Sequence, residues 1–233
     1  MISGLILQTS NRSRAALRAF LLLTGAVLGI CGTAWADGPV GIPDVHIGDL
    51  WSYRTVDGYT NETTLEFTHR IVKLSDKEIV LQLQNKNVSG RKLLFYTREW
   101  NSTDVGEGRF DPFYPEYKFP LKVGDTWNQE FKSSDNHGTS FSSFVRAKIV
   151  ALEKVTVPAG TFDAYRIERD IESRKANADA NIAKGRIITW FAPAVKKYVR
   201  RECMTFSDGR ERSKTVDELI EYSLQEKSAK PSN

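Results

Sequence analysis

Residues 65–71 read Leu-Glu-Phe-Thr-His-Arg-Ile, and this alternation decides the fold. Every second residue, starting from the leucine, falls on one side of an extended chain, and the charged and polar residues between them fall on the other. The same period of two returns at residues 165–171 and 220–224. Such alternation is typical of half-buried antiparallel strands, so the sequence predicts an all-β protein. Residues 173–184 lack an apolar stripe, and we expect a mobile loop or a single frayed helix that joins two strands of a long hairpin.

The chain also repeats itself in three places. The matched pairs keep the same order in both halves and are residues 48–51 with 124–127, 67–74 with 144–152, and 90–96 with 185–191. One matched tetrapeptide would be chance, whereas three in order indicate a duplicated β-meander. We predict a curved antiparallel sheet or open barrel built from two related β-meander halves. These halves are residues 37–120 and 121–225, and a disordered tail follows at 226–233.

Three blocks of the second half resemble a known family. They are residues 119–127 (Phe-Pro-Leu-Lys-Val-Gly-Asp-Thr-Trp), 155–162 (Val-Thr-Val-Pro-Ala-Gly-Thr-Phe) and 190–195 (Trp-Phe-Ala-Pro-Ala-Val). Together they are similar to the TapB-like family of secreted bacterial β-rich domains of unknown function, over residues 115–224. The family's last block usually ends in Gly-Val-Gly, where this chain has Ala194 and Lys196. The resemblance implies an all-β protein of the cell envelope, and it implies no catalytic residues.

The first 36 of the 233 residues have the composition of a secretory signal peptide. They carry three arginines and no acidic residue, then an apolar run at 19–30, then Ala34-Trp35-Ala36,. The run is too short to span a bilayer comfortably. We predict cleavage after Ala36, a periplasmic or secreted bacterial protein, and no membrane span after cleavage. An uncleaved anchor is the alternative, and lipid attachment at Cys31 is disfavoured because the bulky Ile30 precedes it.

The formal net charge of +4 comes largely from the signal peptide. The whole chain has 33 basic and 29 acidic residues, so removal of the three arginines leaves 33 − 3 = 30 basic against 29 acidic. A near-neutral protein has no electrostatic basis for binding nucleic acid. We therefore exclude nucleic acid from the expected partners.

Residues that carry catalytic or metal chemistry are few. Cleavage would leave Cys203 as the one cysteine, which excludes an intramolecular disulfide and a four-cysteine metal site,. We expect this thiol to be a small buried residue on a strand. The three histidines, His46, His69 and His137, are far apart in sequence and lack metal-ligand spacing,. We predict no metal, no cofactor and no catalytic residue.

A basic cluster near residue 200 contains Lys196, Lys197, Arg200 and Arg201. On a strand, Lys196 and Arg200 would share one face and the other two the opposite face. The four charges would then form no single patch for an anionic polymer. We expect a solvated edge strand, which lysine and arginine protect from pairing with other chains.

The densest aromatic segment is residues 95–119, with 8 aromatic residues in 25. We expect it to be an irregular connection between the two halves. Rings beside carboxylates can stack on and hydrogen-bond a ligand, and ligand clefts favour such junctions. The candidate ligand-binding residues are Trp100, Phe110, Asp111, Tyr114, Glu116 and Tyr117. The alternative is that the segment packs its rings into the core of the junction.

These observations favour a non-enzymatic protein that binds an envelope component or a partner protein in a groove of the curved sheet. The first alternative is a structural or assembly factor of the envelope that is recognised through its sheet edges. An uncharacterised hydrolase is the second alternative. A well-formed apolar cavity would favour binding, a long exposed edge strand would favour assembly, and a cleft with paired carboxylates would favour hydrolysis.

Overall fold

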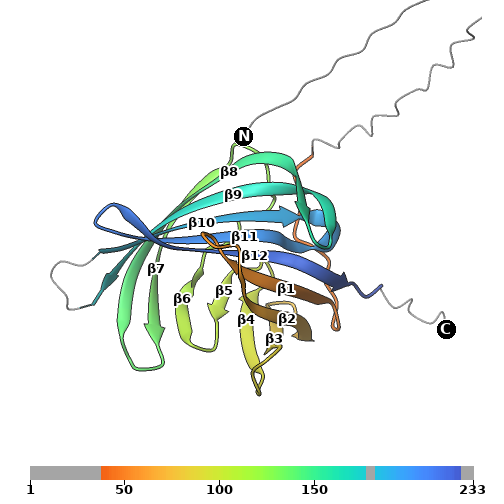
Figure 1. Ribbon diagram of the computed structural model, residues 1–233, viewed down its shortest axis with the longest axis horizontal. Coiled ribbons are helices and arrows are strands. Elements are labelled where there is room, and N and C mark those ends of the chain that lie inside the picture. Colours follow the sequence, from red (N-terminus) through yellow and green to blue (C-terminus); the bar gives the residue numbers. More distant parts are fainter. Residues whose placement is uncertain (1–37, 177–181, 227–233) are drawn as a thin grey trace, which may run out of the picture. The chain divides into compact units, whose positions relative to one another are not determined.

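A computed structural model of the protein describes residues 38–176 and 182–226. These residues form a closed antiparallel barrel of twelve strands, in which each strand pairs with its neighbours in sequence and the last pairs with the first (Figure 1). The predicted all-β fold is confirmed, and the sheet closes fully. The predicted signal peptide, and the predicted tail beyond residue 226, lie outside the described residues.

The twelve strands follow one another as a simple meander. Their bounds are β1 (Leu50–Asp57), β2 (Thr63–Leu74), β3 (Glu78–Asn85), β4 (Lys92–Thr97), β5 (Ser102–Asp104), β6 (Gly108–Tyr114), β7 (Thr126–Asp135), β8 (Ser140–Val157), β9 (Gly160–Lys175), β10 (Ile182–Ala192), β11 (Lys197–Ser207) and β12 (Arg210–Ser223). One short 3-10 helix, η1 (Pro193–Val195), precedes β11. Within the described residues, no helix is long and apolar enough to cross a membrane.

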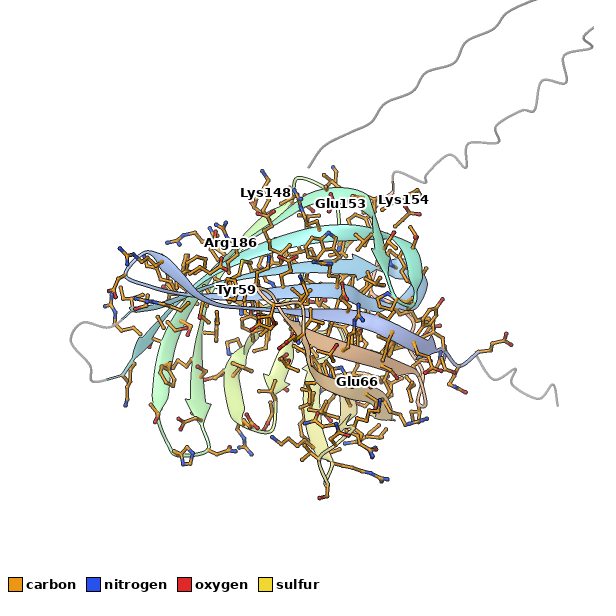
Figure 2. The ribbon with its side chains drawn as sticks, viewed as in Figure 1. Tyr59, Glu66, Lys148, Glu153, Lys154 and Arg186 are labelled. Atoms are coloured by element: carbon orange, nitrogen blue, oxygen red, sulfur yellow. The ribbon has the colours of Figure 1, made fainter. Side chains whose placement is uncertain are left out.

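Strand β2 shows how the alternation produces the barrel wall. Phe67, His69 and Ile71 are buried inside the barrel. The intervening side chains of β2 face outward; Figure 2 labels one of them, Glu66, and, on another part of the barrel, Arg186 of β10. Strand β2 thus buries one row of side chains and exposes the other, as the period of two predicts.

The two Gly-Asp-x-Trp turns have the same backbone geometry. Gly48 and Gly124 both have φ +96°. Each glycine N–H donates to the carbonyl of an isoleucine, Ile71 or Ile149, at 2.9 Å. The aspartate carbonyl in each turn accepts the N–H of that same isoleucine, also at 2.9 Å. Superposition of the complete halves remains a prediction.

The three repeated segments also occupy matching strands. They lie at the start of β1 and β7, on β2 and β8, and on β4 and β10, which are the first, second and fourth strands of each run of six. The boundary predicted at residues 120 and 121 falls in the connection between β6 and β7.

One local prediction was wrong. The aromatic segment 95–119 is mostly strand, because it contains the end of β4, all of β5 and β6, and only then the connection to β7. Antiparallel pairing with neighbouring strands outweighs the weak local pattern there. The segment predicted at residues 173–184 joins the antiparallel strands β9 and β10, as expected, but the strands extend into it, to Lys175 and from Ile182. Residues 177–181, in its middle, lie outside the described residues.

The basic cluster does not lie on an edge strand, so that prediction was also wrong. Strand β11 lies between β10 and β12, and the closed barrel gives it partners on both sides. Lys197 is only 4% exposed. Arg201 pairs in register with Thr189 and Asp217 on the inner face. Closure of the sheet therefore brings two of the four basic side chains into the barrel interior.

The seam between β1 and β12 is held by side chains on both faces. Outside the barrel, Glu218 of β12 accepts hydrogen bonds from Arg54 of β1 at 2.8 Å and Arg200 of β11 at 3.1 Å. Inside it, Asp217 accepts from the Thr55 hydroxyl at 2.7 Å and from Arg201 at 2.8 Å. Asp217 and Glu218 thus each connect β12 to the strands on both sides of it.

One end of the barrel is filled by aromatic and apolar side chains, and we call it the plugged end. The Trp51 indole donates to the Val195 carbonyl of the β10–β11 turn at 2.8 Å, and the Tyr53 hydroxyl donates to the Tyr198 carbonyl at 2.7 Å. The segment before β1 adds Val45, which is 1% exposed. The turns β1–β2, β3–β4 and β5–β6 lie at the other end, because successive strands alternate in direction.

Candidate functional site

The barrel encloses a cavity of ≈450 Å³, which we call the inner cavity. The residues near its mouth come from strand ends and a loop at the end opposite the plug: Leu65, Asn85, Lys92, Val105 and Glu107. The residues near its floor are His69, Tyr96, Ser102, Glu116 and Arg169. The inner cavity therefore extends from one end of the barrel toward the plugged end.

The inner cavity has an apolar part. Seven of its nineteen lining residues are apolar: Leu65, Phe67, Leu83, Leu94, Val105, Phe110 and Ile187. Four of these residues lie on the inward rows of β2, β3 and β4, between polar residues at the mouth and at the floor. Apolar walls with a few convergent polar groups are typical of small-molecule sites of about 300–1,000 Å³.

Arg169 of β9 is the central polar residue of the floor, and it is 1% exposed. Its Nη2 donates to Thr189 Oγ1 at 2.6 Å. Its Nη1 lies 3.9 Å from Glu116 Oε2, which is beyond hydrogen-bond distance,. Glu116 in turn accepts a short hydrogen bond from the Ser102 hydroxyl. The guanidinium is thus held on one side and remains open on the other.

Several buried polar atoms at the floor have no hydrogen-bond partner among the described residues. They include Nε and Nη1 of Arg169 and the hydroxyl of Tyr114. The guanidinium carbon lies 5.4 Å from the centre of the Tyr114 ring. Burial raises the pKa of Tyr114 to about 12, so its hydroxyl keeps its proton at neutral pH. Native proteins leave few such groups unpaired, because each one costs free energy.

A second arginine in the inner cavity is fully engaged. Arg201 donates through Nε and Nη2 to Asp217 Oδ2, at 3.1 and 2.8 Å. Its guanidinium carbon also lies 4.7 Å from the centre of the Tyr198 ring. Since Asp217 and Tyr198 hold this side chain in place, Arg201 shapes the cavity wall and has less capacity for a ligand than Arg169.

Below the floor, Lys197 lies in a cage of aromatic rings. Its Nζ is 5.1 Å from the ring centres of Trp51 and Trp100, and 2.6 Å from His69 Nδ1. Burial and the nearby charge of Arg201 hold the pKa of Lys197 well below its usual value. Burial, followed by the charges of Lys197 and Arg201, also holds the pKa of His69 well below its usual value.

The structure brings only part of the predicted site together. Phe110, Tyr114 and Glu116 line the inner cavity. Trp100 and Tyr117 are 2% and 5% exposed and pack in the core of the plugged end. Asp111 is exposed and does not line the inner cavity, because it alternates with Phe110 on β6. For Trp100 and Tyr117, the alternative expectation for residues 95–119 holds, because these two rings pack into the core.

The most polar residues of the floor were missed from the sequence. Arg169, His69 and Arg201 were not among the predicted site residues. Arg169 nevertheless lies in phase with Tyr165, Ile167 and Ile171, which form the buried row of β9. A charged residue in the apolar phase of a strand is the signal that would have found it.

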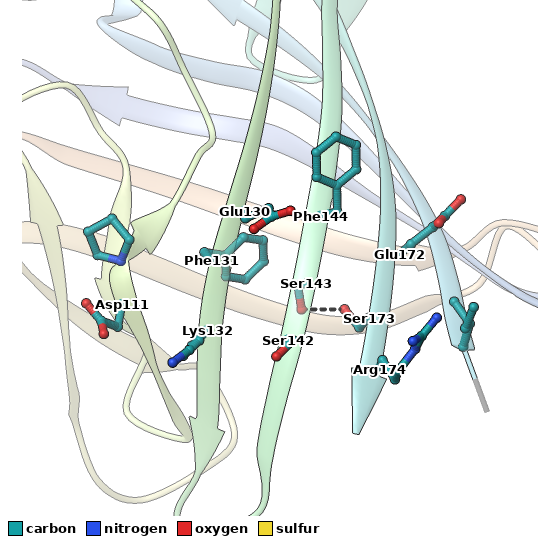
Figure 3. Close-up of a pocket in the computed structure, with 12 residues that line it drawn as sticks. Asp111, Glu130, Phe131, Lys132, Ser142, Ser143, Phe144, Glu172, Ser173 and Arg174 are labelled. Atoms are coloured by element: carbon teal, nitrogen blue, oxygen red, sulfur yellow. Dashed lines mark hydrogen bonds between the residues drawn. The ribbon is translucent and has the colours of Figure 1, made fainter. Parts of the chain in front are cut away.

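A second pocket, of ≈500 Å³, lies where β6 separates from β7, and we call it the junction pocket (Figure 3). Strands β6 and β7 pair only from Gly108 to Asp111. The lining includes Asp111, Glu130, Lys132, Phe144 and Arg174, and Ser143 bonds to Ser173 at 2.7 Å. The polar atoms that line it include none that is both buried and unpaired. The inner cavity is therefore the stronger candidate site.

Other chemistry is sparse in the described part of the chain. Cys203 lies on β11, as predicted, and is a half-buried free thiol. It pairs in register with Ile187 on the inner face, and burial raises its pKa. Among residues 38–176 and 182–226, no three His, Cys, Asp or Glu side chains gather to hold a metal ion.

Comparisons with known proteins show which solved structures have a similar fold. No family model matches the chain, and no curated protein matches it. A structure described as a lipoprotein from Parabacteroides distasonis superimposes with a TM-score of 0.52 at 14% identity, covering 80% of this chain and all of the other. An exported protein with a YmcC-like fold from Bacteroides fragilis gives 0.51, with the same identity and coverage. The fold is similar to that YmcC-like fold.

A third similar structure is the lipoprotein YmcC of Escherichia coli. It has a TM-score of 0.44 at 7% identity, and the match covers 76% of this chain and 86% of that one. At 14% identity, the likeness to the first two structures is one of fold alone.

Proposed function

We propose that this protein is an exported, non-enzymatic binding protein that takes a small apolar or amphiphilic component of the cell envelope into the inner cavity. The observation that carries the proposal is the ≈450 Å³ cavity with apolar walls and polar groups at its floor. A cavity of this size suits a small molecule better than a protein segment. The binding site is thus proposed inside the closed barrel and not in a groove of an open sheet.

Export is part of this proposal. The basic, apolar and Ala-Trp-Ala segments of residues 1–36 support it,. Two proteins that share the fold are described as a lipoprotein and an exported protein, which agrees with it. We propose a periplasmic or secreted protein cleaved after Ala36, related to the TapB-like domains. N-terminal sequencing of protein from the envelope fraction should begin at Asp37; a start at Met1 or a lipid-modified Cys31 would contradict the cleavage.

The two alternatives have less support. An assembly factor recognised through sheet edges needs a long free edge, and the twelve described strands form a closed barrel,. A hydrolase needs paired carboxylates, or a histidine next to a carboxylate, in its cleft, whereas the two cavity carboxylates below the mouth hydrogen-bond to other residues and His69 hydrogen-bonds to Lys197,. Asp217 accepts from Thr55 and Arg201, and Glu116 accepts from Ser102. Binding without catalysis therefore agrees best with the geometry.

The test compares two leucines of neighbouring strands. Leu83 of β3 lines the inner cavity, whereas Leu93 of β4 is 47% exposed on the outside. Leu83→Trp would fill part of the cavity, and Leu93→Trp would add the same side chain to the surface. The neutral fluorescent probe N-phenylnaphthylamine should bind the wild type and Leu93→Trp equally. It should bind Leu83→Trp about tenfold more weakly or not at all, because a loss of about 1.4 kcal/mol of apolar contact weakens binding tenfold.

Circular dichroism and melting of both variants provide the control for folding. Equal binding to all three proteins would place the probe elsewhere on the barrel and contradict the proposal, as would no binding to the folded wild type. Mass spectrometry of small molecules that copurify from the native envelope would then identify the natural ligand.

A further inference from the structure

We infer that the ligand of the inner cavity is a single-chain amphiphile with an anionic head group, and that Arg169 and Tyr114 bind this head group at the cavity floor. The inference rests on the function proposed above and adds the chemical class of the ligand. Its apolar chain would lie along the walls toward the mouth.

The buried guanidinium of Arg169 is the first observation. A charged side chain that is 1% exposed needs compensating partners,. Arg169 has one hydrogen bond, to Thr189, and a contact of 3.9 Å with Glu116. Its Nε and Nη1 have no acceptor among the described residues. Because a guanidinium has only donors, the group that satisfies it must be an acceptor, and an anion is the strongest acceptor.

The second observation is the hydroxyl of Tyr114, which also lacks a partner. Tyr114 lines the same cavity, and its ring lies beside the Arg169 guanidinium at 5.4 Å. Burial raises its pKa to about 12, so the hydroxyl can donate. Two independent donors therefore converge on the floor from β6 and β9.

The carboxylates around the floor do not satisfy Arg169. Two arginines, Arg169 and Arg201, lie there with two acidic residues, Glu116 and Asp217. Asp217 accepts hydrogen bonds from Arg201 and Thr55. Glu116 accepts a hydrogen bond from Ser102 through one oxygen, and its other oxygen lies 3.9 Å from Arg169. Arg169 is therefore the arginine of the floor that no carboxylate reaches within hydrogen-bond distance, and an anionic head group would supply that acceptor.

The size and apolar walls of the cavity indicate that a single apolar chain is attached to the head group. The space above Arg169 is bounded by Phe67, Leu83, Leu94, Phe110 and Ile187. Ile187 is the register partner of Arg169 on β10, so the apolar wall begins directly beside the guanidinium. An anion without a chain would leave this apolar volume unfilled, whereas a single chain fills it and gains the hydrophobic contribution.

The experiment measures decanoate and decanol binding to the full mature protein by calorimetry. The two ligands share a chain and differ in the charge of the head. Wild type should prefer decanoate by about tenfold or more, the factor expected for a charge-assisted hydrogen bond. Decyl phosphate, compared in the same way, distinguishes a carboxylate preference from a general anion preference, and tighter binding of either anion than of decanol supports the inference.

Variants assign the preference to the floor. Arg169→Met should abolish the preference for the anion and leave decanol binding within about threefold. Tyr114→Phe should reduce the preference in part, because one donor remains. Arg146→Met is the matched control, since Arg146 is exposed on the outer face of β8, and it should change neither affinity. If Arg169→Met does not fold, the wild-type preference and Tyr114→Phe decide the matter.

The possible results separate the two proposals. Equal affinity of wild type for decanoate and decanol would overturn the anionic head group while the binding function stands. A preference that survives in folded Arg169→Met would overturn the assignment to Arg169. Binding of the naphthylamine probe without binding of any decyl ligand would overturn the amphiphile class, and failure of the probe as well would overturn the binding function itself.

Discussion

His69 links the interior of the barrel to pH. The imidazole is 5% exposed, and burial with the charges of Lys197 and Arg201 holds its pKa well below the ordinary value of 6.5. In the unfolded chain the same histidine takes up a proton near pH 6.5. Below that pH the unfolded state binds more protons than the folded state, so acidification favours unfolding.

The free energy of unfolding should therefore be highest above pH 6.5 and fall as the pH drops toward the folded pKa of His69. Each unit by which that pKa is lowered adds about 1.4 kcal/mol to the loss. Urea unfolding between pH 7.5 and 5 should show a shallower fall for His69→Phe than for wild type. The control is His137→Gln, in the exposed β7–β8 turn, which should keep the wild-type slope. Equal slopes for His69→Phe and wild type would contradict this account.

Residue chemistry also explains which site residues the sequence could predict. Tyr114, Glu116 and Phe110 were predicted because rings and carboxylates cluster in one stretch, and all three line the inner cavity. Arg169 lies in the apolar phase of β9, which identifies the face it occupies, and Arg201 lies among other charged residues of β11. Neither position shows which residues face it across the barrel, because these come from strands that are distant in sequence and meet only when the barrel closes.

At the scale of elements, the paired Gly-Asp-x-Trp turns offer a direct comparison. Gly48 and Gly124 share φ +96°, a conformation that side chains with a Cβ rarely adopt,. A Cβ on Gly124 would have no atom within 4 Å, whereas a Cβ on Gly48 would lie 3.1 Å from Cγ of Gln225. The Gln225 N–H donates to Asp49 Oδ1 at 2.6 Å, so this contact resists displacement.

Both alanine substitutions should destabilise the protein. Gly124→Ala should cost about 1–3 kcal/mol of unfolding free energy from backbone strain alone. Gly48→Ala should cost more, because Gln225 must also move. Denaturant midpoints at constant m-value are the measurement. Equal costs would mean that the contact with Gln225 contributes nothing to the free energy of unfolding. A larger cost for Gly124→Ala would contradict the geometry.

Strands with strong alternation, such as β2 and β9, could be predicted from sequence. Strand β5 could not, since its residues Ser102–Asp104 are too few to show a period,. The edge location predicted for residues 196–201 failed for a related reason. Charge on an outward-facing row looks the same on an edge strand and on a central strand of a closed barrel, so the pattern does not identify neighbours.

At the scale of the whole molecule, the two halves depend on each other. Residues 121–225 contain β7 to β12, which in the full chain pair with β6 and β1. Alone, this half would leave two edge strands unpaired and its apolar inner face open to water. The full chain should unfold in one transition, with tryptophan fluorescence and circular dichroism coinciding.

Residues 121–225 expressed alone should instead associate or remain without a cooperative transition, as measured by size-exclusion chromatography and thermal melting. A stable monomer with a sharp transition would show that each half folds independently. Composition and alternation predicted the all-β class, but closure requires Leu50 to meet Ser223. Local patterns do not encode a pairing across that sequence separation, so the sequence predicted a curved sheet or open barrel and not a closed one.

The seam between β1 and β12 also sets the order in which the protein can be completed. A chain that emerges from its amino terminus presents β1 first, and β1 keeps one unpaired side until β12, the final strand, arrives. Contacts between such distant segments form slowly, and an unpaired strand edge invites association with other chains. The nascent protein can therefore associate with other chains through the open edge of β1 until β12 has emerged. Glu218 and Asp217, which bond β12 to β1, stabilise the barrel only after that point.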